Sequence, residues 1–150
     1  SENVRTPTTA SQGELIDMLL ILIVVLLSSL SFQFFMISTR LSCVNRIFIN
    51  TPKELFLSAI PLLDIDEDSL PHFDKEKLEM NINKYYETSI RKYVESYTTN
   101  FYYFNQEDKS LCLENYCSSV EVGINAVIGL EVNYSKTITY KIEKGAMYGI

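Results

Sequence analysis

An uncharged run of apolar residues, MLLILIVVLLSSLSFQFFMI from Met18 to Ile37, limits what this chain can fold into. A helix needs about 20 such residues to cross the core of a bilayer. A helix that is apolar all round could also be buried in a soluble protein, but a chain of 150 residues is too small to surround it. A secretory signal peptide has a shorter apolar region that ends in small residues, whereas this run ends in bulky ones. The run therefore predicts a single transmembrane helix over residues 18–37, with a lipid membrane as its partner.

Three polar side chains interrupt the apolar run, namely Ser29, Ser31 and Gln33. Such groups hydrogen-bond to neighbouring helices inside a membrane. A serine hydroxyl can also bond to a carbonyl of its own helix, and the sequence fits both uses. We expect these three residues to be helix-packing residues that contact other protein subunits.

Two signals give opposite orientations for this helix. The charged side chains of the tail over residues 1–17 are mostly acidic, whereas the cations Arg40, Arg46 and Lys53 follow the run. The positive-inside rule therefore places the C-terminal part in the cytoplasm. Cys112 and Cys117, however, frame the short stretch LENY, where a disulfide could close a loop in an oxidising compartment. Two unrelated thiols fit the spacing equally well. We expect the disulfide, and with it an extracytoplasmic C-terminal domain.

A membrane-proximal segment over residues 38–73 follows, in which Pro52, Pro61 and Pro71 separate short elements. The sequence Thr51-Pro52-Lys53-Glu54 predicts the start of a short helix, with Thr51 as cap and Pro52 at the first helical position. This helix would lie on the membrane surface or against the domain that follows. Its apolar face would consist of Leu55, Phe56, Ala59 and Ile60.

The remaining residues, 74–150, predict an α+β domain. Asp74 caps an amphipathic helix whose apolar side chains recur at helical spacing. We expect its tyrosines to belong to the core, because a tyrosine buries a large area while its hydroxyl finds a polar partner. The apolar positions of this helix are Leu78, Ile82, Tyr86, Tyr93 and Tyr97, with Tyr85 and Ile90 beside them.

The spacing of apolar residues changes to two from Phe101 onward, which is typical of half-buried strands. Even-numbered residues from Val120 to Tyr134 are apolar, and the pattern resumes at Ile138 after a polar break at residues 133–136, so we expect a long hairpin. Residues 101–104 and 111–113 predict a second hairpin. The amphipathic helix would pack on the apolar face of the resulting antiparallel sheet.

Composition and motifs argue against most chemical functions. A net charge of −6 without a dense basic patch argues against a nucleic-acid partner. With one histidine and no catalytic motif at a recognisable spacing, we expect neither an enzyme nor a cofactor. Asp64, Asp66 and Asp68 alternate as at the start of a calcium loop, but Ser69 and Lys75 stand where such a loop has glycine and glutamate. We therefore expect no metal site, with these three carboxylates as the only calcium candidates.

Gly13-Glu14-Leu15-Ile16-Asp17 leads directly into the apolar run and resembles the N-terminal region of TadE-like minor pilins. The order of tail, apolar helix, amphipathic helix and terminal sheet is similar to the layout of type IV pilins. In these families the apolar helix first anchors the subunit and then packs in a pilus, so the resemblance implies assembly rather than catalysis. Two positions depart from the family pattern: residues precede the cleavage position after Gly13, and Met18 stands where a glutamate is expected, with Asp17 one residue earlier.

These observations predict a single-pass, membrane-anchored structural subunit of a larger surface or envelope complex. One alternative is a membrane-anchored binding or sensor module that uses residues 64–68 for a cation or the edge of the sheet for a peptide. Another alternative is a non-catalytic accessory subunit of a membrane enzyme complex.

Overall fold

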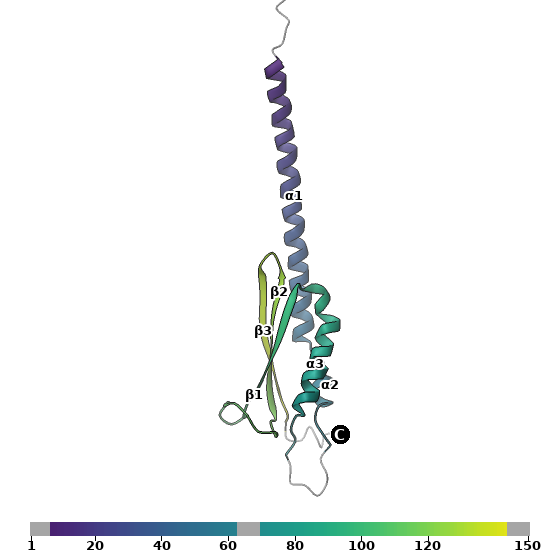
Figure 1. The fold of residues 1–150 in the computed structure, drawn as a ribbon, viewed down its shortest axis with the longest axis vertical. Coiled ribbons are helices and arrows are strands. Elements are labelled where there is room, and N and C mark those ends of the chain that lie inside the picture. Colours follow the sequence, from purple (N-terminus) through teal and green to yellow (C-terminus); the bar gives the residue numbers. More distant parts are fainter. Residues whose placement is uncertain (1–6, 63–69, 144–150) are drawn as a thin grey trace, which may run out of the picture. The chain divides into compact units, whose positions relative to one another are not determined.

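The computed structural model describes residues 7–62 and 70–143. The chain divides into two compact units, Ser1–Thr39 and Arg40–Ile150. The predicted architecture, a long apolar helix followed by a small α+β domain with an antiparallel sheet, is confirmed at this level (Figure 1). The elements in chain order are α1 (Pro7–Ile49), α2 (Lys53–Leu57), α3 (Lys75–Ser89), a 3-10 turn η1 (Arg91–Tyr93), β1 (Ser96–Tyr103), β2 (Ser119–Gly129) and β3 (Val132–Lys141).

Helix α1 extends beyond the predicted span at both ends. Its first residue is Pro7, so the predicted tail is already helical before Met18, and a proline is well suited to the first helical position. No proline or glycine occurs between Glu14 and Thr51, so nothing in the backbone stops the helix after Ile37. The helix ends only ahead of Pro52.

Side chains satisfy the last carbonyl groups of α1. The amide of Asn50 donates to the carbonyl of Arg46 at 2.9 Å, and the hydroxyl of Thr51 donates to the carbonyl of Phe48 at 2.6 Å. The backbone amides of Asn50 and Thr51 donate to the same two carbonyls at 3.1 and 3.2 Å, so backbone and side chain together close the end of the helix.

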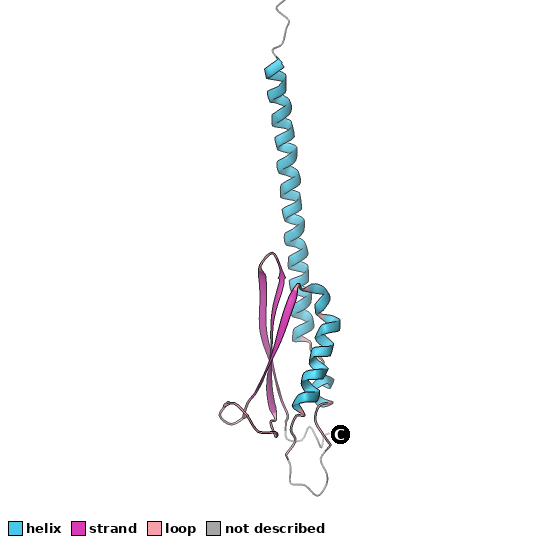
Figure 2. Cartoon of the chain, viewed as in Figure 1, coloured by secondary structure: helices cyan, strands magenta, loops and turns pink. Residues whose placement is uncertain are grey.

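The sheet has the order β1-β2-β3, with both pairs antiparallel (Figure 2). Central strand β2 alternates as predicted: its even-numbered side chains from Val120 to Ile128 are buried. The outer face carries exposed polar side chains such as Thr98, Asn125 and Thr137. The sheet is therefore half-buried, as the spacing of two requires.

The core of the domain unit lies between the sheet, α3 and the last turns of α1. Phe48 is fully buried, and its ring centroid lies 5.7 Å from that of Tyr86 on α3 and 6.4 Å from that of Tyr134 on β3. The other fully buried large side chains include Val44, Phe73, Leu78, Ile82, Ile90, Val120, Val122, Ile124 and Ile128.

The start of α3 matches the prediction, but its end does not. The side chain of Asp74 caps the helix by accepting from the backbone amide of Lys77 at 3.3 Å. The helix ends at Ser89, so Tyr93 lies in η1 and Tyr97 lies in β1. Tyr97 satisfies the helical spacing and also the alternation of the following strand, and the β-branched Thr98 and Thr99 favour the strand.

The long hairpin forms, but its turn lies earlier than predicted. Leu130 and Glu131 form a two-residue loop with φ angles of 47° and 62°, and residues 133–136 belong to β3. Asn133 and Ser135 resemble turn residues because they lie on the exposed face of the strand, whereas Tyr134 between them faces the core. The second predicted hairpin reduces to an isolated bridge between Phe104 and Leu111.

Helix α2 begins one residue later than predicted, with Pro52 at its cap position and no side-chain cap. The hydroxyl of Thr51 is engaged elsewhere, because it lies 2.9 Å from the hydroxyl of Tyr86. Phe56 is buried, and its ring stacks on that of Tyr140 at a centroid distance of 4.6 Å. Of the two predicted locations for this helix, packing against the domain is therefore confirmed.

We predict that Phe48→Ala lowers the free energy of unfolding of the domain by about 3–5 kcal/mol, because it opens a cavity among packed rings. The neighbouring side chain of Ile49 is 46% exposed, so Ile49→Ala should cost about 1 kcal/mol or less. Denaturant unfolding of the full chain in mild detergent, followed by the near-ultraviolet circular dichroism of its tyrosines, measures both changes. Equal decreases in the free energy of unfolding for the two variants would show that the packing of Phe48 does not stabilise the core.

Candidate assembly surfaces

The apolar side chains of α1 form the largest exposed apolar surface on the described residues. From Leu15 to Phe35 the large apolar side chains are about half exposed or more, reaching 67% at Phe35. Within the described part of the chain, Ser11–Ile49 is the helix long and apolar enough to cross a membrane. A surface of this extent is unfavourable in water.

The predicted packing residues all lie within α1 and are exposed, but they do not share one face. Ser29 and Gln33 are four residues apart and therefore lie on the same side of the helix, whereas Ser31 lies on the opposite side. The hydroxyl of Thr39 donates to the carbonyl of Phe35 at 2.9 Å, which is the within-helix use of a hydroxyl. Ser29 and Gln33 together form the stronger candidate contact with a second helix.

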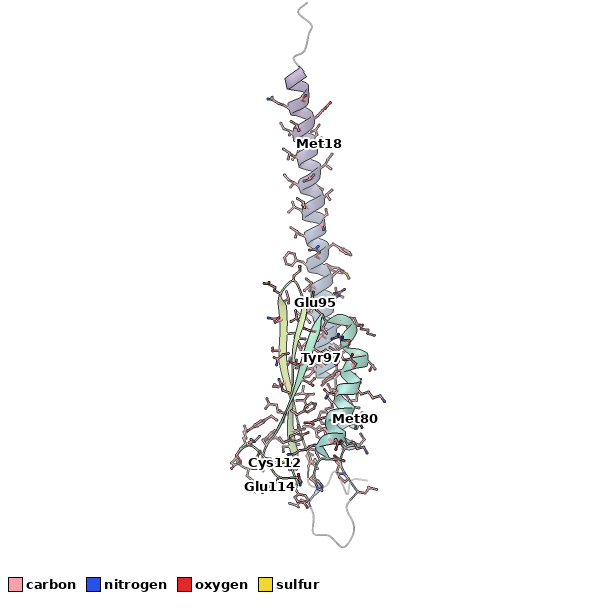
Figure 3. All side chains as sticks on the ribbon, in the orientation of Figure 1. Met18, Met80, Glu95, Tyr97, Cys112 and Glu114 are labelled. Atoms are coloured by element: carbon pink, nitrogen blue, oxygen red, sulfur yellow. A yellow bond between two sulfur atoms is a disulfide. The ribbon has the colours of Figure 1, made fainter. Side chains whose placement is uncertain are left out.

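Cys112 and Cys117 are joined by a disulfide that closes a short loop at one end of the domain (Figure 3). The backbone amide of Phe73 donates to the carbonyl of Cys117 at 2.9 Å, so the loop is fixed to the segment before α3. The ring of Tyr116 contacts the ring of His72 edge-on at a centroid distance of 4.9 Å. The loop is therefore held both covalently and by its neighbours.

The disulfide loop presents apolar side chains to solvent. Leu113 is 81% exposed and Tyr116 is 64% exposed. Neither residue stands out in the sequence as a contact residue. The feature that indicates their exposure is their position between two bonded cysteines, because a loop this short cannot cover its own side chains.

The outer face of the sheet offers an open polar surface instead. A shallow hollow of about 370 Å³ lies over the centre of the sheet, where the Ser135 hydroxyl donates to Asn125 Oδ1 at 2.6 Å. Its lining includes Asn100, Tyr102, Glu121, Asn125, Ser135, Lys136 and Thr137. Hydroxyl and amide groups of this kind remain favourably hydrated, so this face does not require a partner.

Several tyrosine hydroxyls in the domain have raised pKa values, chiefly because they are buried. Burial raises the pKa of Tyr86 to about 12, although its hydrogen bond with Thr51 acts in the opposite direction. Burial, followed by the nearby Glu79 carboxylate, raises the pKa of Tyr103. Burial also raises the pKa of Tyr97 to about 12, and the Glu87 carboxylate that accepts its hydrogen bond adds to this. These hydroxyls join α3 to the residues after α1 and to β1, which is a structural role.

The candidate calcium carboxylates Asp64, Asp66 and Asp68 lie outside the described residues. Within the described residues, no group of three histidine, cysteine, aspartate or glutamate side chains is arranged to hold a metal ion. The hydrogen bonds donated to Asp108 by Ser110 lower the pKa of that carboxyl, which stabilises an exposed turn.

No protein-family model, curated protein or solved structure matches the chain. The surfaces described above therefore carry the functional argument on their own.

We predict that alkaline pH destabilises the domain through Tyr86. The unfolded chain ionises this tyrosine near pH 10 and the folded domain ionises it at about 12, so the contribution is present below pH 10 and is lost as the pH rises toward 12. A shift of this size corresponds to about 2–3 kcal/mol. Denaturant unfolding of the full chain between pH 8 and pH 12 measures the loss.

The matched variants are Tyr86→Phe and Tyr116→Phe, which remove a buried hydroxyl and an exposed one. Tyr86→Phe should cost about 1 kcal/mol at pH 8, because the hydrogen bond with Thr51 is lost, and should then lose less stability on alkalisation than the parent chain. Tyr116→Phe should follow the parent. An unchanged pH profile in Tyr86→Phe would contradict the assignment.

Proposed function

We propose that this chain is a single-pass, membrane-anchored structural subunit of a larger surface or envelope assembly, built in the manner of a pilin. One observation carries the proposal: α1 exposes apolar side chains on all sides and continues without a helix break into a domain that has its own core. A lone soluble domain of this size would have no use for such a helix.

In this proposal the helix has two kinds of partner. The lipid membrane surrounds α1 before assembly, and helices of other subunits replace part of the lipid afterwards. Ser29 and Gln33 support the second step, because polar side chains on one face of an apolar helix hydrogen-bond to a neighbouring helix. Gly13 to Asp17 support the resemblance to TadE-like minor pilins, since they lie within the same continuous helix.

The C-terminal domain would contact other subunits on the extracytoplasmic side. The disulfide between Cys112 and Cys117 supports this side, because disulfides persist in oxidising compartments. Exposed Leu113 and Tyr116 supply an apolar contact surface on the disulfide loop. Arg40 and Arg46 favour the cytoplasmic side instead, according to the positive-inside rule.

Cross-linking within the helix tests the assembly proposal. In a Cys43→Ser background, we expect oxidation of native membranes to cross-link Ser29→Cys to a neighbouring subunit. Leu27→Cys lies on the opposite side of the helix and should cross-link much less. Denaturing electrophoresis with mass spectrometry measures both yields. No cross-link at either position would mean that the helix is surrounded by lipid alone, and equal yields would mean that the face with Ser29 and Gln33 is not a preferred contact.

Thiol labelling of intact cells or particles with a membrane-impermeant maleimide tests the side of the domain. We expect Cys112 and Cys117 to react only after reduction and without lysis, with Cys43 as the internal free-thiol reference. Mass spectrometry of the labelled peptides measures each site. Labelling of both cysteines as free thiols only after lysis would place the domain in the cytoplasm.

A further inference from the structure

We propose that one end of the domain, formed by Arg40 and the turn between β2 and β3, rests on the membrane surface. Leu130 would enter the headgroup region, and the cations around it would lie against anionic lipid headgroups. This inference rests on the proposed function, since it requires residues 18–37 to span a bilayer.

Contacts within the domain place the β2–β3 turn at the same end as Arg40. The Tyr134 hydroxyl donates to Asn45 Oδ1 at 2.8 Å, and further along β3 the ring of Tyr140 stacks on that of Phe56. Strand β3 therefore runs from the level of Asn45 toward α2. Its other end, which leads into the turn, therefore lies on the side of Asn45 that is away from α2 and faces the preceding turn of α1, which contains Arg40.

Helix α3 brings further side chains to this end. The amide of Asn81 donates to the hydroxyl of Ser58 at 3.1 Å, whereas Tyr86 contacts Phe48. The helix therefore runs in the direction from α2 toward Arg40, and η1 follows it. The backbone amide of Glu95 donates to the carbonyl of Val127 at 2.8 Å, which brings the segment after η1 beside the last residues of β2.

Leu130 is an unfavourable residue for its position unless it has an apolar environment. Its φ is 47° and that of Glu131 is 62°, whereas a turn of this kind favours asparagine and glycine. Leucine in this conformation is strained. Its side chain is 59% exposed, so packing within the domain does not account for it. Departures from local preference are typical of functional positions, and the interfacial region of a membrane would bury this side chain.

The charges at the two ends of the domain also differ. The end that carries Leu130 has the exposed cations Arg40, Arg91 and Lys92, together with the carboxylates of Glu95 and Glu131. The disulfide-loop end has the exposed carboxylates Glu107, Asp108, Glu114 and Glu143, beside Lys109 and Lys141. Clustered lysine and arginine side chains next to a span are attracted to anionic headgroups. By sequence, Arg40 comes three residues after Ile37, the end of the predicted span.

The absence of tryptophan from the chain provides a direct test, because a single introduced tryptophan reports on its own environment. The full chain is reconstituted in phosphatidylcholine vesicles, with or without phosphatidylglycerol, that contain lipids brominated near the headgroup or deep in the acyl chain. Three variants are compared: Leu130→Trp, Val25→Trp within the apolar helix, and Leu113→Trp at the disulfide loop. Glu131→Trp is a second reporter at the turn.

We expect lipid brominated near the headgroup to quench Leu130→Trp several-fold more than Leu113→Trp. Deep bromine should quench Val25→Trp. Omitting phosphatidylglycerol should reduce the quenching at position 130 by about twofold or more. Lys92→Glu should reduce this lipid dependence, while the matched Lys109→Glu should leave it unchanged.

The outcomes separate the inference from the proposed function. If Val25→Trp is quenched but Leu130→Trp and Glu131→Trp behave like Leu113→Trp, the turn does not contact the membrane surface and the inference is wrong. The proposal that residues 18–37 span the bilayer is then still supported. If Val25→Trp is also unquenched, both fail. If position 130 is shielded from aqueous iodide yet unquenched by brominated lipid, a protein covers it and the inference is wrong. Equal quenching with and without phosphatidylglycerol overturns the role of the cations.

Discussion

The burial of Phe48 is the contact on which the rest of the domain depends. Its ring lies among Tyr86 of α3 and Tyr134 of β3, so a single side chain of α1 meets both layers of the domain. The polar ends of the same two tyrosines bond to residues on either side of Phe48, with Tyr134 donating to Asn45 and Tyr86 next to Thr51. Apolar packing and hydrogen bonding thus act on the same turns of α1. Through them the end of α1 joins α3 and the sheet in one core.

Local patterns in the sequence were sufficient to predict the helices and strands in which apolar residues recur at a single spacing. The alternation along β2, the Asp74 cap and the continuous apolar run all correspond to observed elements. The pattern was ambiguous where two periods overlap, as at Tyr97, or where the exposed side of a strand is as polar as a turn, as at residues 133–136. The contact of Asn45 with Tyr134 spans 89 positions along the chain, and no local pattern contains that information.

The candidate surfaces also divide into those that local patterns predict and those that they do not. The apolar helix, its polar interruptions and the paired cysteines were visible in the sequence because each depends on composition or short spacing. Leu113, Tyr116 and Leu130 were not identified, because an apolar residue in a loop is noteworthy only once its exposure is known. For Leu130 the deciding fact is a backbone angle, which composition does not predict. Exposure and conformation are therefore what the structure adds to the argument.

The distance along the chain between the two halves of the core has a consequence for biosynthesis. Residues 18–37 leave the ribosome well before β3, which supplies Tyr134 and Tyr140 to the core. The apolar run is therefore available for membrane insertion while Val44 and Phe48 still lack their partners. In the proposed subunit, membrane insertion would come first and the domain would fold afterwards onto a helix that is already anchored. Folding of the domain would then be a late event that occurs beside the bilayer.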